Sequence, residues 1–114
     1  MDDSALFLSS AKHLLSAVAE LEVVGEALSG PEALRQIETL RPDVVLLDIG
    51  MPGMDGIEVA RIVKARPGAP HVVLVSLYDS DEYRRASAAL QVDGFLAKTE
   101  FGTGVVPLLR ALCR

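Results

Sequence analysis

The sequence predicts an α/β fold in which helices cover both faces of one parallel sheet, a doubly wound arrangement. Short apolar runs alternate with segments whose apolar residues recur at helical spacing, a pattern typical of parallel strands joined by crossover helices. The run Val44–Leu47 contains no polar residue, so both faces of that strand are expected to be buried. The chain of 114 residues has room for one domain, spanning residues 1–114, but not for two.

Composition and charge exclude several classes of protein. The formal net charge of −5 at pH 7 argues against direct binding of nucleic acid by this domain. The single cysteine, Cys113, excludes an internal disulfide and a multi-cysteine zinc site. No apolar run is long enough to span a bilayer, and the two acids that follow Met1 do not begin a signal peptide. We therefore expect a cytoplasmic domain without membrane contact.

The first part of the chain is expected to form a helix, a strand and a second helix. Over Ser4–Glu20, apolar residues recur at i, i+4, i+7, i+8 and i+11, which places them on one helical stripe. A short strand is predicted at Glu22–Glu26. Ser29-Gly30-Pro31 then begins a helix, because proline suits the first helical position, and that helix is expected to end near Leu40, before Pro42.

The remaining chain continues the alternation after the strand at Val44–Leu47. The expected elements are a helix at Gly56–Ala65 capped by Asp55 and Glu58, a strand at His71–Val75, a helix capped by Ser80 or Asp81, a strand at Gly94–Ala97, and a helix at Thr103–Leu112. Proline lacks the N–H that a helix interior uses, so Pro107 is expected in the first turn of the last helix.

A carboxylate ends the central apolar strand. Asp48 directly follows Val44–Leu47, and in open α/β sheets ligands bind beyond the carboxyl ends of the strands. An acid in this position is also common as the first solvated residue after a core strand. The loop that follows favours the functional interpretation, because residues 48–56 read D-I-G-M-P-G-M-D-G and lead into the cap of the next helix.

This D-x-x-M-P-x-M-D-G segment resembles the phosphoacceptor segment of response-regulator receiver domains, the receiving half of bacterial two-component signalling. The resemblance implies a flavodoxin-like fold with strand order 2-1-3-4-5. Lys98-Thr99 and the Leu-Tyr-Asp after Ser76 look most like receivers of the NarL/LuxR or FixJ type, which carry helix-turn-helix output domains. No such output domain follows here, so we expect a stand-alone regulator or an isolated receiver.

The family's first strand should precede the acids Asp2 and Asp3, but only Met1 stands before them. In the strand order above that missing strand is central. We therefore expect a shortened start, with the place of the strand filled by a rearrangement or by a segment from another copy, as in a homodimer or a strand-exchanged dimer.

The resemblance also implies a phosphoryl-transfer site. Asp48 would accept a phosphoryl group from a sensor histidine kinase and form an aspartyl phosphate. Asp2, Asp3, Asp48 and the backbone carbonyl of Gly50 would hold Mg²⁺, a hard cation that prefers oxygen ligands.

Two further residues would contact the phosphoryl group itself. Lys98, at the end of the last strand, matches the family lysine that pairs with this group. Ser76 matches the hydroxyl residue that hydrogen-bonds one of the phosphoryl oxygens.

Switching residues are implied by the same resemblance. Phe95 matches an aromatic that swings inward while Ser76 moves toward the phosphoryl group, which reshapes the surface of the fourth helix and last strand for an output domain or partner protein. Gly50 and Tyr78 match positions that tune autodephosphorylation. Neither supplies a carboxylate or amide to orient a water molecule, so a slow loss of phosphate is expected.

Each of these residues also has a simpler interpretation. Lys98 alone is an ordinary surface lysine, Ser76 a strand-end serine, and Phe95 a packed core residue. Asp2 and Asp3 belong to a terminus, and terminal residues that no sheet holds are usually mobile. Together, however, these residues support one another.

Three alternative functions differ in class from a phosphorylation-controlled switch. The first, favoured by the missing strand, is a receiver-like interaction module that is not phosphorylated. The second, a phosphatase of the haloacid-dehalogenase type, is disfavoured because Gly50 stands where that family has a second aspartate. The third, a flavin or dinucleotide binder, lacks its glycine-rich phosphate loop. We therefore expect a switch, not an enzyme, with at most weak self-phosphorylation or autodephosphorylation activity.

Overall fold

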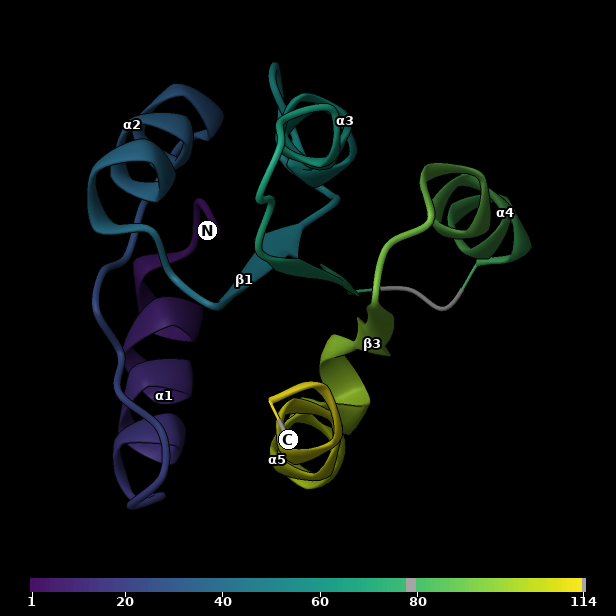
Figure 1. Cartoon of the computed structure of the whole chain (residues 1–114). Helices are drawn as coiled ribbons and strands as arrows, with labels where there is room; N and C mark the ends of the chain where they lie inside the picture. The colour runs from purple at the N-terminus through teal and green to yellow at the C-terminus, as the bar shows by residue number, and fades with distance from the viewer. Residues whose placement is uncertain (78–79, 114) are drawn as a thin grey trace.

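A single parallel sheet with the strand order β1-β2-β3 lies at the centre of the computed structural model, which describes residues 1–77 and 80–113 (Figure 1). In chain order the elements are α1 (Ala5–Ser16), α2 (Gly30–Leu40), β1 (Val44–Asp48), α3 (Gly56–Lys64), β2 (His71–Ser76), α4 (Asp81–Leu90), β3 (Gly94–Ala97), the 3₁₀ turn η1 (Lys98–Glu100) and α5 (Phe101–Leu112). The three described strands lie where the apolar runs predict them.

Alternate strand residues face opposite layers of the molecule. Val45 and Leu47 of β1 belong to a core cluster with Val59 and Val63 of α3. The residue between them, Leu46, packs on the other face with the cluster formed by α1 and α5. Figure 1 shows α2, α3 and α4 on one side of the sheet and α1 and α5 on the other. The sheet is thus covered on both faces, as the uninterrupted apolar run predicts.

The helices α2, α3 and α4 begin where the sequence predicts them, and Asp55 and Ser80 act as the predicted caps. The side chain of Ser29 accepts a hydrogen bond from the Glu32 backbone N–H at the start of α2, and Asp55 accepts from two backbone N–H groups of α3. Ser80 caps α4 by accepting from the Tyr83 backbone N–H. Each cap satisfies N–H groups that have no partner within the first helical turn.

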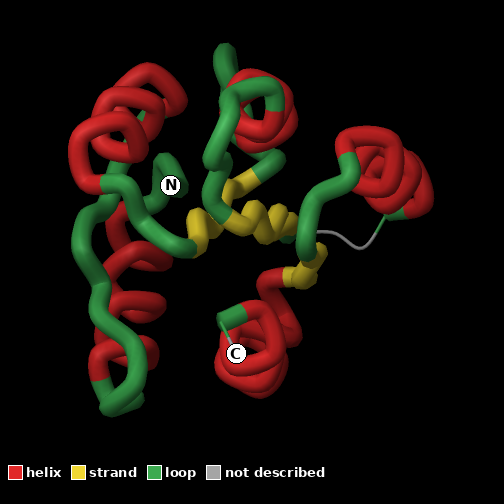
Figure 2. The backbone as a smooth tube through the Cα atoms, viewed as in Figure 1, coloured by secondary structure: helices red, strands yellow, loops and turns green. Residues whose placement is uncertain are grey.

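The predicted strand at Glu22–Glu26 is wrong. The segment 21–27 has no regular secondary structure and runs as an open loop from the end of α1 to the start of α2 (Figure 2). Within the described ranges 1–77 and 80–113, no backbone hydrogen bond joins this segment to β1. A strand exists only when a neighbour completes its ladder, and a cavity of about 590 Å³ lies between this segment and β1.

Two helix boundaries also differ from the prediction. The first helix ends at Ser16 and not at Glu20, because the N–H groups of Ala17 and Val18 turn back to carbonyls three residues earlier. The last helix begins at Phe101, directly after η1, so Pro107 lies in its interior and not in its first turn. Pro107 is exposed, so water can reach the carbonyl that loses its helical partner there.

None of the helices in the described part of the chain has the length and hydropathy that a membrane span requires.

Candidate functional site

The carboxyl ends of the three strands meet at one edge of the sheet. The parallel register places Asp48 beside Val75 and Ser76 beside Ala97, and Lys98 directly follows Ala97. The chain therefore brings polar residues from the ends of three separate strands to the same edge, the usual position of ligand sites in open α/β sheets.

The first residues of the chain are held at this edge by backbone hydrogen bonds. The Met1 amino group donates to the Leu46 carbonyl oxygen at 2.6 Å, and the Asp48 N–H donates to the Met1 carbonyl oxygen at 3.0 Å. On the other side, the Asp2 N–H donates to the Ala27 carbonyl oxygen at 3.1 Å. These bonds place Asp2 and Asp3 next to Asp48, so the structure does not favour the simpler interpretation of a mobile terminus.

The loop after Asp48 is shaped by that side chain and by one glycine. The Gly50 N–H donates to Asp48 Oδ1 at 3.1 Å, which closes a tight turn. A Cβ at Gly56 would lie 2.5 Å from the Asp48 carbonyl oxygen, so only glycine lets α3 begin this close to the end of β1. Gly56 is the last residue of the D-x-x-M-P-x-M-D-G motif, and this close approach explains why glycine stands there.

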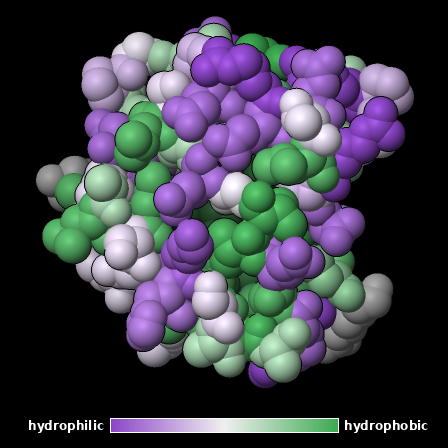
Figure 3. All heavy atoms as spheres, turned by 90° about the vertical axis from the view of Figure 1, so that its left-hand side faces the viewer, coloured by the Kyte–Doolittle hydropathy of each residue, from purple (hydrophilic) through white to green (hydrophobic). Residues whose placement is uncertain are grey.

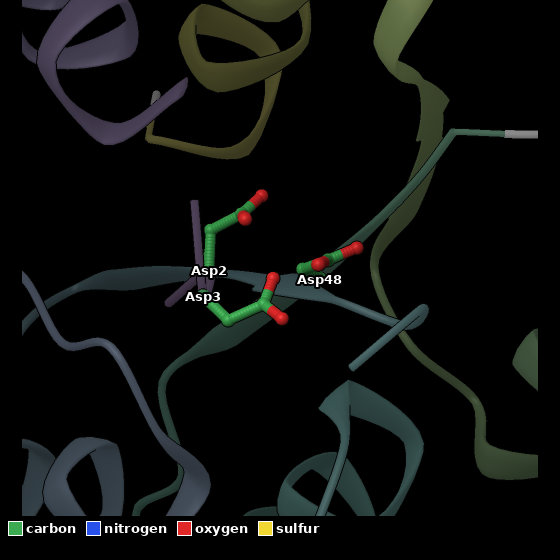
Figure 4. Close-up of side chains that lie close together, drawn as sticks. All are labelled: Asp2, Asp3 and Asp48. Carbon is green, nitrogen blue, oxygen red and sulfur yellow. The ribbon is translucent and has the colours of Figure 1, made fainter. Parts of the chain in front are cut away.

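Three carboxylates converge at the end of β1. One oxygen from each of Asp2, Asp3 and Asp48 lies within 4.8 Å of the others, and Figure 4 shows the three side chains around a common space. Asp2 and Asp48 are buried, with exposed fractions of 1% and 4%, whereas Asp3 is exposed. Asp2 Oδ1 accepts from the Ser4 N–H at 2.8 Å. A cluster of this kind is electrostatically costly unless positive charge lies within or beside it.

Lys98 supplies positive charge to this cluster. Its Nζ lies 2.6 Å from Asp2 Oδ2 and 3.7 Å from Asp48 Oδ2. The same nitrogen lies 4.4 Å from the centre of the Phe7 ring, and the Phe7 ring in turn packs edge-on against Phe101 at 5.1 Å. A cation over an aromatic face is attracted by the ring quadrupole. Phe7 is one of the apolar residues on the stripe predicted for the first helix, and no local signal indicates that it lies beside Lys98.

The sequence of the chain agrees with this geometry. Residues 1–103 match the family described as the response regulator receiver domain. The chain belongs to this family.

Two curated relatives match this chain over one part of their own length. The chain is 39% identical over 107 residues to protein-glutamate methylesterase/protein-glutamine glutaminase 2 of Koribacter versatilis, a match covering 92% of this chain and 29% of that protein. It is 28% identical over 111 residues to the DNA-binding transcriptional activator EvgA of Escherichia coli K12, covering 97% of this chain and 54% of that protein. The chain thus spans about half or less of the curated relatives that it matches.

A solved structure supports both the family and the fold. The signal receiver domain of NarL from Mycobacterium tuberculosis is 36% identical and superposes with a TM-score of 0.84, covering 96% of this chain and 91% of that chain. The predicted receiver family, its NarL-type relatives and its flavodoxin-like parallel fold are therefore confirmed. Membership of the receiver family of two-component response regulators is consistent with phosphorylation-dependent switching.

The electrostatics of the receiver site affect Asp48 most clearly. Burial raises the pKa of the Asp48 carboxyl above its ordinary value, and the neighbouring charges of Asp2 and Asp3 act in the same direction. The hydrogen bond from the Gly50 N–H and the Lys98 ammonium group oppose this rise without cancelling it. Asp2 Oδ2 is also buried and, apart from its ion-pair contact with Lys98, has no hydrogen bond of good geometry among the described residues.

The other predicted residues of the receiver lie in distinct places. Ser76 ends β2 and is 2% exposed, and it makes further polar contact there. Phe95 lies partly buried in β3, where the Arg84 guanidinium carbon is 4.9 Å from the centre of its ring. Gly50 is exposed beside Asp48, and Tyr78 lies outside the described residues.

Proposed function

We propose that this receiver is a signalling switch that takes a phosphoryl group on Asp48 from a sensor histidine kinase. The observation that carries the proposal is the meeting of Asp48 with two further carboxylates and with Lys98 at the carboxyl edge of the sheet. Phosphoryl transfer depends mainly on positioning and on neutralising the charge of the transferred group. A nucleophilic carboxylate, a set of oxygen ligands and a cation are the groups that this chemistry uses.

The three carboxylates fit a divalent cation. Their oxygens lie within 4.8 Å of one another, and Asp2 Oδ2 is a buried oxygen without a well-aligned hydrogen bond. Mg²⁺ prefers such oxygen ligands, so Asp2, Asp3 and Asp48 would hold it, with the Gly50 carbonyl as a further ligand suggested by the family resemblance. When bound, Mg²⁺ would supply positive charge that neutralises the phosphoryl oxygens and the acidic cluster.

The protein's own groups would orient the phosphoryl group. Lys98 Nζ lies 3.7 Å from Asp48 Oδ2, so a small movement away from Asp2 would bring the ammonium group onto a phosphoryl oxygen on Asp48. The Phe7 ring, 4.4 Å from the same nitrogen, also attracts the ammonium group. Ser76 lies one strand away, at the matching end of β2, where its hydroxyl would donate to another phosphoryl oxygen.

The output of the switch would be a change in the surface formed by α4, β3 and α5. Phe95 would turn inward as Ser76 moves toward the phosphoryl group, which would end the contact between the Phe95 ring and Arg84. An output domain or a partner protein would recognise that surface. Gly50 carries no side chain to orient a water molecule for hydrolysis, so the phosphorylated state would decay slowly, with at most weak catalytic activity of its own.

A second function has one observation in its favour. The sheet described here has three strands, and a cavity of about 590 Å³ lies beside β1 at the side from which the acids Asp2 and Asp3 approach. If that side is too loosely held for the acids to bind a metal ion, the chain would serve as an interaction module that is not phosphorylated.

Intact mass spectrometry distinguishes the two functions. After incubation with Mg²⁺ and acetyl phosphate, we expect the parent protein to gain the mass of one phosphoryl group and Asp48→Asn to gain none. Asp43→Asn is the matched control, because Asp43 is an exposed aspartate at the opposite end of β1, and it should be phosphorylated like the parent. No gain in the parent would contradict the switch, and an equal gain in Asp48→Asn would contradict Asp48 as the acceptor.

A further inference from the structure

Two partners of Lys98 belong to one short segment of the chain. Its Nζ lies 2.6 Å from Asp2 Oδ2 and 4.4 Å from the centre of the Phe7 ring. Asp2 Oδ1 accepts from the Ser4 N–H at 2.8 Å, and Ser4 Oγ accepts from the Phe7 N–H at 3.2 Å. These two hydrogen bonds join the carboxylate and the ring into one unit at the start of α1, so both partners of the ammonium group are placed together.

A second aromatic residue restricts the orientation of the Phe7 ring. The Phe101 ring lies 5.1 Å from it at an interplanar angle of 68°, which is an edge-on contact. Lys98 begins η1, and Phe101 follows directly after this turn. Because side chains three residues apart lie on the same side of a 3₁₀ turn, the cation and the supporting ring approach Phe7 from one turn of the chain. Packing therefore sets which ring face Lys98 meets.

Little water reaches the surroundings of Lys98. Its side chain is 16% exposed, and the side chains of Asp2 and Asp48 are 2% and 5% exposed. Phe7 packs against the apolar cluster of α5 that includes Val105. Figure 3, which views the molecule from the side of α1 and α2, shows apolar side chains across the middle of this face. The attraction between a cation and an aromatic ring strengthens when water is excluded, so this contact is in a favourable place.

The ring attracts the ammonium group in a different way from the carboxylates. A carboxylate pairs with the charge of lysine, whereas an aromatic face has no net charge and attracts a cation without neutralising it. Under the proposed function Asp2 would also serve a divalent cation, which would compete with Lys98 for its charge. The attraction of the Phe7 ring for Lys98 does not depend on what the carboxylates bind.

We propose that Phe7 is a positioning residue for phosphoryl transfer, whose ring keeps the Lys98 ammonium group beside Asp48 with its charge available. This inference rests on the proposed function. In the transfer an Asp48 carboxylate oxygen forms a bond to phosphorus, while the bond from phosphorus to the donor atom breaks and its electron pair leaves with the donor. Lys98 keeps its protons and pairs with a phosphoryl oxygen, whose negative charge it compensates.

A ring that only fills space would behave differently from a ring that positions a cation. The first acts through its volume and could be replaced by another ring of the same size. The second acts through the negative electrostatic potential of its face, which ring fluorination withdraws with little change in size. Fluorination of Phe7 therefore separates the two roles.

Site-specific fluorination is the test of the proposal. Phe7 is replaced in turn by phenylalanines with one, two and three ring fluorines, and the rate of Asp48 phosphorylation by acetyl phosphate with Mg²⁺ is followed by intact mass. We expect the rate to fall with each added fluorine, by about fivefold over the series. The same series at Phe101, the ring that supports Phe7, is the matched control and should change the rate by less than about twofold.

A second measurement observes the contact in the unmodified, metal-free protein. Protons that lie over an aromatic face resonate upfield, so the ε-methylene protons of Lys98 should be shifted upfield relative to those of Lys12, an exposed lysine of α1. We expect this shift to be lost in Phe7→Leu and restored in Phe7→Tyr. Absence of the shift in the parent, or its persistence in Phe7→Leu, would overturn the proposal. If Phe7→Leu does not fold, the fluorinated series decides.

The outcomes also separate this inference from the proposed function. A parent protein that gains no phosphoryl group contradicts the proposed function, and this inference with it. A parent that is phosphorylated equally fast with and without fluorine on Phe7 overturns this inference alone. An equal fall in rate for the Phe7 and Phe101 series would show that ring packing sets the rate, and would also overturn it.

Discussion

Two aspartates of this receiver, Asp93 and Asp48, each lie beside a lysine, yet the pKa values of their carboxyl groups are shifted in opposite directions. Asp93 lies 2.7 Å from Lys64 Nζ, accepts from the Val72 N–H at 2.7 Å, and has His71 Nδ1 at 3.3 Å. Burial alone would raise its pKa, but these donors together lower the pKa below its ordinary value. Asp48 also has a lysine nearby, but its pKa is raised.

The neighbours explain the difference. Around Asp93 every charged or polar partner named above donates a hydrogen bond or carries positive charge, so the ionised form is stabilised. Around Asp48 two other carboxylates share the space, and Lys98 lies closer to Asp2 than to Asp48. The Asp93 carboxylate therefore stabilises the fold. The negative charge of Asp48 is not fully compensated, so it is available for a cation or a reaction.

The largest change in the free energy of unfolding is expected from removing the carboxylate of Asp93. Asp93→Ala leaves the Lys64 ammonium group and the buried Val72 N–H without their shared partner, so the free energy of unfolding should fall by about 2–3 kcal/mol. Urea unfolding at pH 7 measures it. Asp43→Ala, at an exposed aspartate, is the control and should change little. A loss at Asp93 no larger than at Asp43 would mean that the Asp93 contacts contribute nothing.

Mg²⁺ should sharpen the contrast by stabilising only the acidic cluster. A ligand that binds the folded state at ten times its dissociation constant adds about 1.4 kcal/mol to the free energy of unfolding. We expect such a gain for the parent and its loss in Asp3→Asn, while Asp93→Asn should keep it. Urea unfolding with and without Mg²⁺ gives these values. A full gain in Asp3→Asn would contradict Asp3 as a ligand.

Asp48→Asn should stabilise the metal-free protein. The substitution removes a buried charge that two acids repel, so the free energy of unfolding at pH 7 is expected to rise by about 1 kcal/mol. In metal-free buffer with a chelator, urea unfolding of this variant and the parent measures the change. Destabilisation of similar size would show that the Asp48 charge is satisfied by Lys98 and Gly50.

The contributions of Asp93 and Asp48 to the free energy of unfolding should also depend on pH in opposite ways. The pKa of Asp93 is lowered on folding, so its stabilisation is complete above the unfolded value, about 3.9, and is lost as pH falls through the folded value. The pKa of Asp48 is raised, so its cost is absent below about pH 3.9 and grows as pH rises through the folded value. Unfolding curves of the parent, Asp93→Asn and Asp48→Asn at several pH values without metal separate the two. If the unfolding free energies of both variants differed from the parent in the same way at every pH, the opposite pKa shifts of Asp93 and Asp48 would be contradicted.

The smallest effect is expected at the surface. Arg110 Nε donates to Glu20 Oε2 at 2.9 Å, but both side chains are mostly exposed. Exposed ion pairs contribute little because water and salt screen them. Glu20→Gln should leave the unfolding midpoint unchanged within error, and a clear loss would mean that this contact holds the end of α1 against α5.

Sequence reasoning succeeded where a local pattern determines the outcome. The apolar run Val44–Leu47 predicted β1. The segment Ser29-Gly30-Pro31, the cap Asp55 and the alternatives Ser80 or Asp81 predicted three helix starts. The D-x-x-M-P-x-M-D-G segment placed Asp48 at the end of its strand.

It failed where the outcome depends on distant partners. Glu22–Glu26 has the composition of a strand but no neighbour to pair with, and the exposure that lets Pro107 lie inside α5 is set by tertiary packing. The contacts of Lys98 with Phe7 and of Asp93 with Lys64 join residues far apart in the chain, so no spacing rule reveals them.

The position of the Met1 amino group has a practical consequence. It donates to the Leu46 carbonyl, and burial lowers its pKa. An affinity tag or fusion partner joined at this end would convert the charged amino group into a neutral amide beside β1, and so disturb the contact that holds the acids that follow. A tag at Arg114 avoids this artefact, and comparing the two tagged forms offers a simple control for any measurement on this receiver.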